Sequence, residues 1–153
     1  MKKKINCVLL IDDDEPTTFL SQMVIEEAGL SKTIQVASSG ADALAYLTSA
    51  RDNRTADHWY PDLIFLDINM PAMNGWEFLQ KYQDLDNRIK QDVIIIMLTT
   101  SLNPDDRLRA EAITSVRGFE HKPLTGEKLD GIVKKYFTES FDKKNSGSLP
   151  FPD

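Results

Sequence analysis

Polar residues follow four short strand-like runs of this chain, three of them apolar and the fourth, 118–121, a weak strand expected mainly from its order and position. The polar signals are Asp12–Asp14, Asp67, Thr99 and Lys122, after runs at 8–11, 63–66, 94–98 and 118–121. Short continuous apolar runs are typical of strands that are buried on both faces of a parallel sheet. Parallel strands bring their carboxyl ends to one edge, and ligands of open α/β sheets bind there. The pattern therefore predicts a parallel sheet with a polar site at its edge.

Helix-like segments separate these runs, and Thr33–Ala37 adds a fifth strand that is rich in β-branched residues. Helices are expected from Pro16 to Gly29, from a cap at Ser38 or Ser39, over about 76–84, from Pro104, and from a cap at Thr125. The residues expected on their buried faces are Phe19, Leu20, Met23 and Val24; Ala41, Leu44, Ala45 and Leu47; Phe78, Leu79 and Tyr82; and Leu129, Ile132, Val133, Tyr136 and Phe137. The segment 51–58 is polar and loop-like.

The resulting order is (βα)₅, in which strands and helices alternate. Right-handed crossovers between parallel strands favour the flavodoxin-like order 2-1-3-4-5, with helices on both faces of the sheet. In that order the first strand lies beside the third, so Asp12, Asp13 and Asp67 are predicted to meet. One domain is expected over residues 4–138, and the polar segment 139–153 is expected to be a flexible tail.

Composition excludes several classes of protein. The formal charge is −6 and the pI is near 4.9, which argues against a nucleic-acid-binding face. No apolar run is long enough to cross a bilayer, so no membrane insertion is expected. The basic start at Lys2–Lys4 lacks a following cleavage site, which argues against export. The single cysteine, Cys7, fits a reducing compartment as a small core residue, and a cytoplasmic location is expected.

The polar residues suggest phosphoryl chemistry beside a hard cation. Mg²⁺ prefers carboxylate oxygens, which Asp13 and Asp67 would supply, and a divalent ion would relieve the repulsion between the acids. Asp67 is then a candidate nucleophile, with Lys122 and Thr99 contacting phosphoryl oxygens. Each signal also has an ordinary structural explanation, because an aspartate after a strand often caps a helix and a lysine before proline is often a surface residue. Their common placement at strand ends favours the functional interpretation.

These motifs together resemble the receiver domain of two-component response regulators, of the stand-alone chemotaxis type. The matching segments are Val8–Asp14, Pro61–Pro71 followed by Asn74-Gly75, Ile96–Thr100, and Gly118–Pro123. The resemblance covers about residues 4–138. The motifs are weak singly and specific in combination.

The resemblance implies a role for each matching residue. Asp67 would be the phosphoacceptor, and Asp67 and Asp13 would bind Mg²⁺ with the backbone carbonyl of Asn69. Asp12 would support the metal through water. The other implied features are phosphoryl contacts from Thr99 and Lys122, a cis Lys122–Pro123 bond, and Phe119 as an aromatic switch residue; a simple core role for Phe119 stays open.

Three features depart from the usual family pattern. Asp13 lies 54 positions before Asp67, a wider gap than is usual, and a longer loop over Arg51–Tyr60, anchored by Trp59 and Tyr60, would hold the excess. Thr100 stands where a smaller residue is common, so it would hinder the hydrolytic water and prolong the phosphorylated state. Phe119 replaces the more frequent tyrosine.

The implied function is that of a phosphoacceptor rather than an enzyme with turnover. A histidine kinase or phosphotransfer protein would donate the phosphoryl group. The helix from Pro104, the strand 118–121 and the last helix would then bind an unknown target or a second copy of the chain.

Two alternatives remain at this point. A phosphatase of the haloacid dehalogenase type would use similar residues, but Pro16 stands where its opening motif needs threonine or valine. A phosphate-independent interaction module would not need the complete set Asp12, Asp13, Asp67, Thr99 and Lys122.

Overall fold

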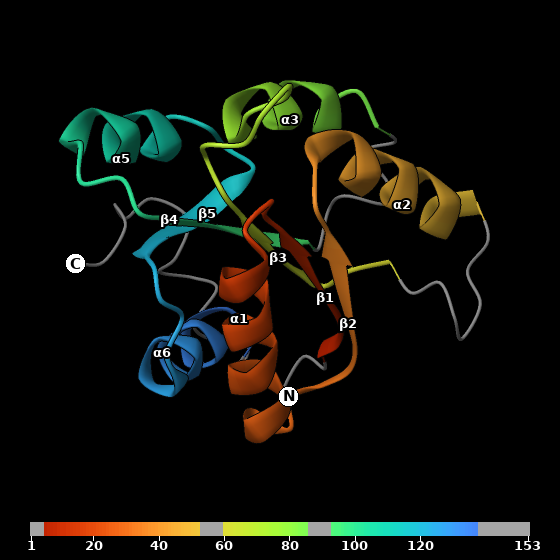
Figure 1. Cartoon of the computed structure of the whole chain (residues 1–153), viewed down its shortest axis with the longest axis vertical. Helices are drawn as coiled ribbons and strands as arrows, with labels where there is room; N and C mark the ends of the chain where they lie inside the picture. The colour runs from red at the N-terminus through yellow and green to blue at the C-terminus, as the bar shows by residue number, and fades with distance from the viewer. Residues whose placement is uncertain (1–4, 53–59, 86–92, 138–153) are drawn as a thin grey trace.

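A five-stranded parallel sheet forms the centre of the computed structural model, which describes residues 5–52, 60–85 and 93–137 (Figure 1). Within those ranges the strands pair in the order β2-β1-β3-β4-β5. The strands are β1 Ile5–Ile11, β2 Ser31–Ala37, β3 Leu63–Leu66, β4 Ile94–Thr99 and β5 Val116–His121. The flavodoxin-like fold and the strand order predicted from the sequence are confirmed.

Helices cover both faces of this sheet, as predicted (Figure 1). The helices are α1 Glu15–Ala28, α2 Gly40–Asp52, α3 Gly75–Tyr82, α5 Pro104–Glu111 and α6 Gly126–Tyr136. Helices α1 and α6 lie on one face, where Ile25, Leu129 and Ile132 pack against the strands. Helices α2, α3 and α5 lie on the other, where Leu47 and Phe78 belong to a second apolar cluster. None of the described helices is long and apolar enough to cross a membrane.

Capping side chains fix where the helices begin. The Asp14 carboxylate accepts from the Thr17 amide, and Thr125 Oγ1 accepts from the Lys128 amide. Asn74 and Glu77 form a reciprocal capping box at the start of α3. These caps fix the starts of α1, α3 and α6, the helices that follow β1, β3 and β5 along the chain.

Strand boundaries differ from the predicted ones in extent. Strand β1 begins at Ile5 rather than Val8, because Ile5 and Cys7 pair with Ser31 and Thr33 of β2. Strand β5 begins at Val116, which pairs with Ile95 before an irregularity in the register. Pairing with a neighbouring strand extends both segments beyond their continuous apolar runs.

The predicted buried face of α1 was wrong for three of its four residues, because only Val24 packs against the core. Phe19, Leu20 and Met23 are 62%, 52% and 42% exposed, whereas Thr18, Ser21 and Ile25 are buried. The cap at Asp14 fixes where the helix begins, and the rotation that follows turns positions 18, 21 and 25 toward the sheet. Helix α2 shows a smaller error of the same kind: Ala41 and Ala45 are exposed, and its buried residues are Gly40, Ala43, Leu47 and Ala50.

The predicted loop before β3 begins later than expected, because Arg51 and Asp52 belong to α2. Tyr60 is half-buried and packs against the core, as the anchoring role requires. The rest of that loop, including Trp59, and the predicted tail 139–153 lie outside the described residues.

Candidate functional site

Three acidic side chains meet at the carboxyl end of the sheet. Ile11 pairs with Leu66, so the residues that follow them, Asp12 and Asp67, leave adjacent strand ends together. The Asp67 amide donates to the Ile11 carbonyl at 3.0 Å, which ties these two ends. One carboxylate oxygen from each of Asp12, Asp13 and Asp67 lies within 4.8 Å of the others. The predicted convergence of these acids is confirmed.

A lysine from the end of β5 faces two of these acids. The Lys122 ammonium lies 2.7 Å from Asp12 Oδ2 and 3.4 Å from Asp67 Oδ1. Its amide donates to the Thr99 carbonyl at 2.8 Å, and the Lys122–Pro123 bond is cis, as the resemblance implied. The lysine side chain is only 10% exposed, so its charge acts in a partly desolvated environment.

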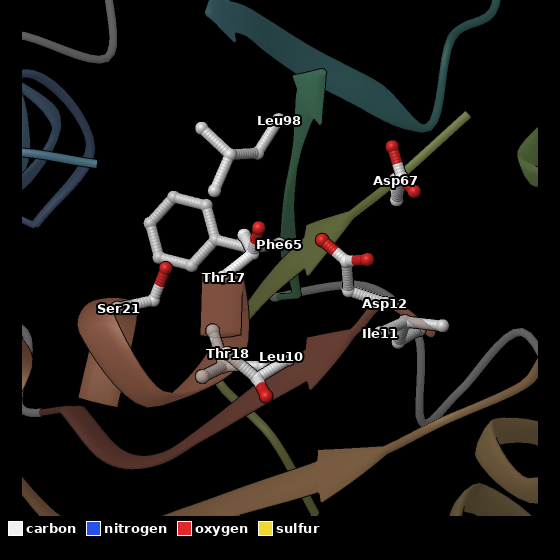
Figure 2. Close-up of a pocket in the computed structure, with 9 residues that line it drawn as sticks. All are labelled: Leu10, Ile11, Asp12, Thr17, Thr18, Ser21, Phe65, Asp67 and Leu98. Carbon is white, nitrogen blue, oxygen red and sulfur yellow. The ribbon is translucent and has the colours of Figure 1, made fainter. Parts of the chain in front are cut away.

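Helix α1 closes the site from the side. A cavity of about 10 Å³, the size of one water molecule, lies between the strand ends and this helix. Figure 2 shows Asp12 and Asp67 on one side of it, with Thr17, Thr18 and Ser21 of α1 on the other. The sequence pattern missed these three hydroxyl residues because it assigned the opposite face of α1 to the core.

The pKa values of Asp67 and Lys122 are both raised, but for different physical reasons. Burial and the Asp12 charge raise the pKa of Asp67 from an ordinary 3.8 to about 6, against the opposing effect of Lys122. Burial alone would lower the pKa of Lys122, but the hydrogen bond and charge of Asp12 and the charge of Asp67 raise it above its usual value. At neutral pH the site therefore holds ionised Asp67 beside a firmly protonated lysine.

The donor set fits a hard divalent cation. Mg²⁺ takes oxygen ligands and commonly one or two carboxylates, and the site offers three carboxylates at its solvent opening. Asp13 is exposed, whereas Asp12 and Asp67 are 6% exposed, so the acids form a site that is open on one side. Asn69 is exposed two residues after Asp67, and ligation by its carbonyl stays a prediction.

Thr99 ends β4 and is completely buried. Its hydroxyl oxygen accepts from the Ser101 amide at 3.0 Å, and Thr99 pairs with His121 just before Lys122. Phe119 is also buried and stands edge-on to the His121 ring at 5.8 Å. The Arg107 guanidinium of α5 lies 5.8 Å from the centre of the Phe119 ring. Both residues thus lie where the ends of β4 and β5 meet α5.

A glycine supports the backbone of Asp67. A Cβ on Gly75 would lie 2.5 Å from the Asp67 carbonyl oxygen and 3.1 Å from Ile68 Cα. The Gly75 amide donates to the Ile68 carbonyl at 2.8 Å. The sequence singled out Asn74-Gly75 only within a segment that resembles the receiver family, and nothing in its pattern indicated this close approach.

Cys7 has no place in the site. It is completely buried in β1, and its sulfur lies 3.8 Å from the Tyr46 hydroxyl. Burial raises the pKa of its thiol to about 11, so it is a core residue and not a nucleophile, as predicted.

Known response regulators resemble this chain over most of its length. The family model that describes the response regulator receiver domain matches residues 8–134 of this chain. Response regulator Rre1 of Synechocystis is 30% identical over 141 residues, which are 92% of this chain and 55% of that protein. Sporulation initiation phosphotransferase F of Bacillus subtilis is 28% identical over 129 residues, covering 84% of this chain and 91% of that protein. The chain therefore spans about half the length of Rre1.

Solved structures of response regulators also resemble this chain. A two-component response regulator from Cytophaga hutchinsonii matches with a TM-score of 0.79 and 34% identity, covering 88% of this chain and 98% of that one. The chemotaxis protein CheY4 of Vibrio cholerae matches with a TM-score of 0.67 and 26% identity, covering 87% and 99%.

Proposed function

The chain belongs to the response regulator receiver family of signalling phosphoacceptors, and on that premise we propose that Asp67 is the residue that accepts the phosphoryl group. The observation that carries this assignment is the meeting of three carboxylates within 4.8 Å, with the Lys122 ammonium facing Asp12 and Asp67. Of the three acids, Asp67 is the one at the end of the central strand β3 and is nearly buried. Asp13, in contrast, is exposed.

The proposed transfer uses Asp67 as a carboxylate nucleophile. Oδ1 of Asp67 accepts from the Ile68 amide at 2.9 Å and faces Lys122, so Oδ2 is the oxygen that attacks phosphorus. The P–N bond of a phosphohistidine donor breaks as the O–P bond forms. The bonding pair returns to the imidazole nitrogen, which takes a proton from solvent. Lys122 offsets charge on the phosphoryl oxygens, and the Thr99 hydroxyl donates to one of them.

We propose Mg²⁺ as the cation of this site. The side chains of Asp13 and Asp67 and the carbonyl of Asn69 would hold it, with Asp12 acting through water. When bound, the ion neutralises the clustered acids and offsets the charge of the incoming phosphoryl group. Three oxygen donors gathered at one opening support this choice.

The exposed apolar side of α1 is where we place the phosphoryl donor, a histidine kinase or phosphotransfer protein. Phe19, Leu20 and Met23 are exposed on the helix whose other side, through Thr18 and Ser21, lines the cavity beside Asp67. A partner seated there would hold its histidine near the opening of the site. Phe19→Asp is expected to slow transfer from a protein donor and leave phosphorylation by acetyl phosphate unchanged. Equal slowing in both assays would contradict this placement.

We propose that the phosphorylated protein contacts its target through α5, β5 and α6. The added group carries up to about two negative charges, which would bias an equilibrium through Thr99 and Phe119. Leu108 on α5 is 62% exposed and offers an apolar contact for a target protein or a second copy. The likeness to CheY4 supports a stand-alone, chemotaxis-type mode of action. We place this action in the cytoplasm and the receiver domain over residues 4–138.

Acetyl phosphate with Mg²⁺ tests the assignment. We expect one phosphoryl group per chain on an adduct that hydroxylamine removes, and no adduct on Asp67→Asn. The control Asp62→Asn changes an aspartate five residues earlier whose carboxylate accepts from the Asn6 and Cys7 amides, and it should still be labelled. A labelled Asp67→Asn chain would contradict the proposal, and an unlabelled wild type would favour a phosphate-independent interaction module.

A further inference from the structure

A groove runs between the edge strand β5 and helix α6, away from the acidic site. Its volume is about 720 Å³, and it shares no lining residue with the cavity beside Asp67. Its floor and walls include Ile96, Gly118, Ile132 and Tyr136, with Lys128 and Lys135 among its charged lining residues. Figure 1 shows α6 on the same face of the sheet as α1.

Two glycines and a tyrosine shape this groove. A Cβ on Gly118 would lie 2.8 Å from Ile96 Cδ1 and 3.3 Å from the Tyr136 hydroxyl, so glycine lets both side chains lie against β5. The Tyr136 hydroxyl donates to the Arg117 carbonyl at 2.6 Å, which fixes that ring in place. A Cβ on Gly131 would meet nothing within 4 Å, so the α6 wall is open to an incoming chain.

We propose that the segment Leu149–Pro152 of this same chain docks in the groove. This segment, Leu149-Pro150-Phe151-Pro152, is the densest apolar stretch after Phe137. Leu149 and Phe151 each precede a proline, which biases both residues toward an extended backbone before docking. Their side chains are apolar, like the groove lining at Ile96 and Ile132. The prolines lack amide donors, so the segment binds through side chains rather than as an added strand.

The tether is long enough for this return. Eleven residues, 138–148, separate Phe137 from Leu149, and they can extend up to roughly 36 Å. Helix α6 has 11 residues and is about 16 Å long, so the segment can fold back along its whole length. Tethering also raises the local concentration of the segment at the groove.

The charged residues that line the groove are of both signs, Glu120 and Glu127 as well as Lys128 and Lys135, and Lys135 is the one that an added carboxylate would favour. Burial and the neighbouring Arg117 lower the pKa of Lys135, so an added carboxylate would stabilise its ammonium. Asp153 follows directly after Pro152 and would bring a carboxylate to the rim. A docked segment would cover β5, the strand that carries Phe119 and leads to Lys122, and would compete with any partner that uses that strand.

Disulfide trapping in the full-length chain tests the proposal. The double variant Gly131→Cys with Ser148→Cys places one thiol on the open wall and one just before Leu149. Cys7, the one native cysteine, is completely buried and does not interfere. Cysteine is a better helix former than glycine, and position 131 has room for it, so the variant is expected to fold.

The matched control moves the helix thiol by one residue. Asp130→Cys with Ser148→Cys has the same tether, but residue 130 is exposed and is not part of the groove. We expect the intrachain disulfide to form about tenfold faster at 131 than at 130. Adding Leu149→Ser and Phe151→Ser should reduce the rate at 131 to that of the control. Equal rates at 130 and 131 would overturn the proposal, and so would a disulfide that forms between two chains, which would assign the groove to a second copy.

Discussion

The Lys122 ammonium lies 2.7 Å from the Asp12 carboxylate, so one cation ties the end of β5 to the end of β1. Asp67 follows β3, which lies between β1 and β5 in the sheet, and the same ammonium lies 3.4 Å from its carboxylate. Two carboxylates and one ammonium leave a net negative charge in a partly buried site. An added cation or proton therefore stabilises this arrangement.

Asp67→Asn is expected to stabilise the metal-free protein at pH 7.5. The pKa of Asp67 is about 6 in the folded protein against an ordinary 3.8, so the folded state binds the proton more tightly. The protonated Asp67 side chain therefore stabilises the folded state fully below about pH 4, and this contribution is lost as the pH rises through 6. The variant should gain about 2 kcal/mol at pH 7.5, or roughly 4 °C in Tm.

Thermal unfolding in a chelating buffer between pH 4.5 and 7.5 measures this gain. The difference between variant and wild type should shrink as the pH falls below 6. A difference that does not change with pH would show that the charge of Asp67 is not its cause.

Mg²⁺ is expected to stabilise the wild type more at pH 7.5 than at pH 5.5, because protons compete with the ion for Asp67. At ten times its dissociation constant the ion should add about 1.4 kcal/mol. Asp13→Asn should reduce this gain at a given Mg²⁺ concentration. Glu15→Gln removes an exposed acid nearby that is not one of the three and should retain the gain. Equal losses in both variants would indicate diffuse screening rather than a site.

Thr100→Ala is expected to shorten the life of the phosphorylated state. Thr100 is exposed directly after the buried Thr99, and its side chain would obstruct the water that hydrolyses the acyl phosphate. Lowering the barrier by about 1 kcal/mol would speed decay about fivefold. Phosphate release after removal of the donor measures the rate. Leu102→Ala, at a residue 84% exposed, is the control, and decay unchanged in Thr100→Ala would refute the obstruction.

Gly75→Ala is expected to destabilise the protein and slow phosphorylation together. The new methyl group would lie 2.5 Å from the Asp67 carbonyl oxygen, so the backbone that carries Asp67 must move. Overpacking of this kind costs about 2 kcal/mol. Gly126→Ala meets nothing within 4 Å and should change stability by less than about 0.5 kcal/mol. Urea unfolding and acetyl phosphate kinetics compare the two variants, and similar results in both would contradict the role of Gly75.

The convergence of these side chains could be predicted because strand ends are local signals. Asp12, Asp67 and Lys122 each follow a strand, and parallel pairing makes those positions neighbours. The cap at Thr125 could be predicted for the same reason, because its hydroxyl oxygen accepts from the amide of Lys128, only three residues later in the sequence.

The rotation of α1 could not be predicted in the same way. Its outer side carries Phe19, Leu20 and Met23, and its inner side carries Thr18 and Ser21. An apolar stripe does not by itself decide which side of a helix faces the core, because packing against the sheet also selects the buried positions. The close approach of Gly75 to Asp67 depends likewise on tertiary packing, which leaves no periodic signal.

Borohydride reduction followed by peptide sequencing identifies the phosphorylated residue itself. Reduction converts a phosphorylated aspartate into homoserine, which marks the modified position. After treatment with acetyl phosphate and Mg²⁺, we expect homoserine at position 67 and at no other aspartate, as the assignment of Asp67 requires. Homoserine at Asp12 or Asp13, or its absence from every peptide, would contradict it.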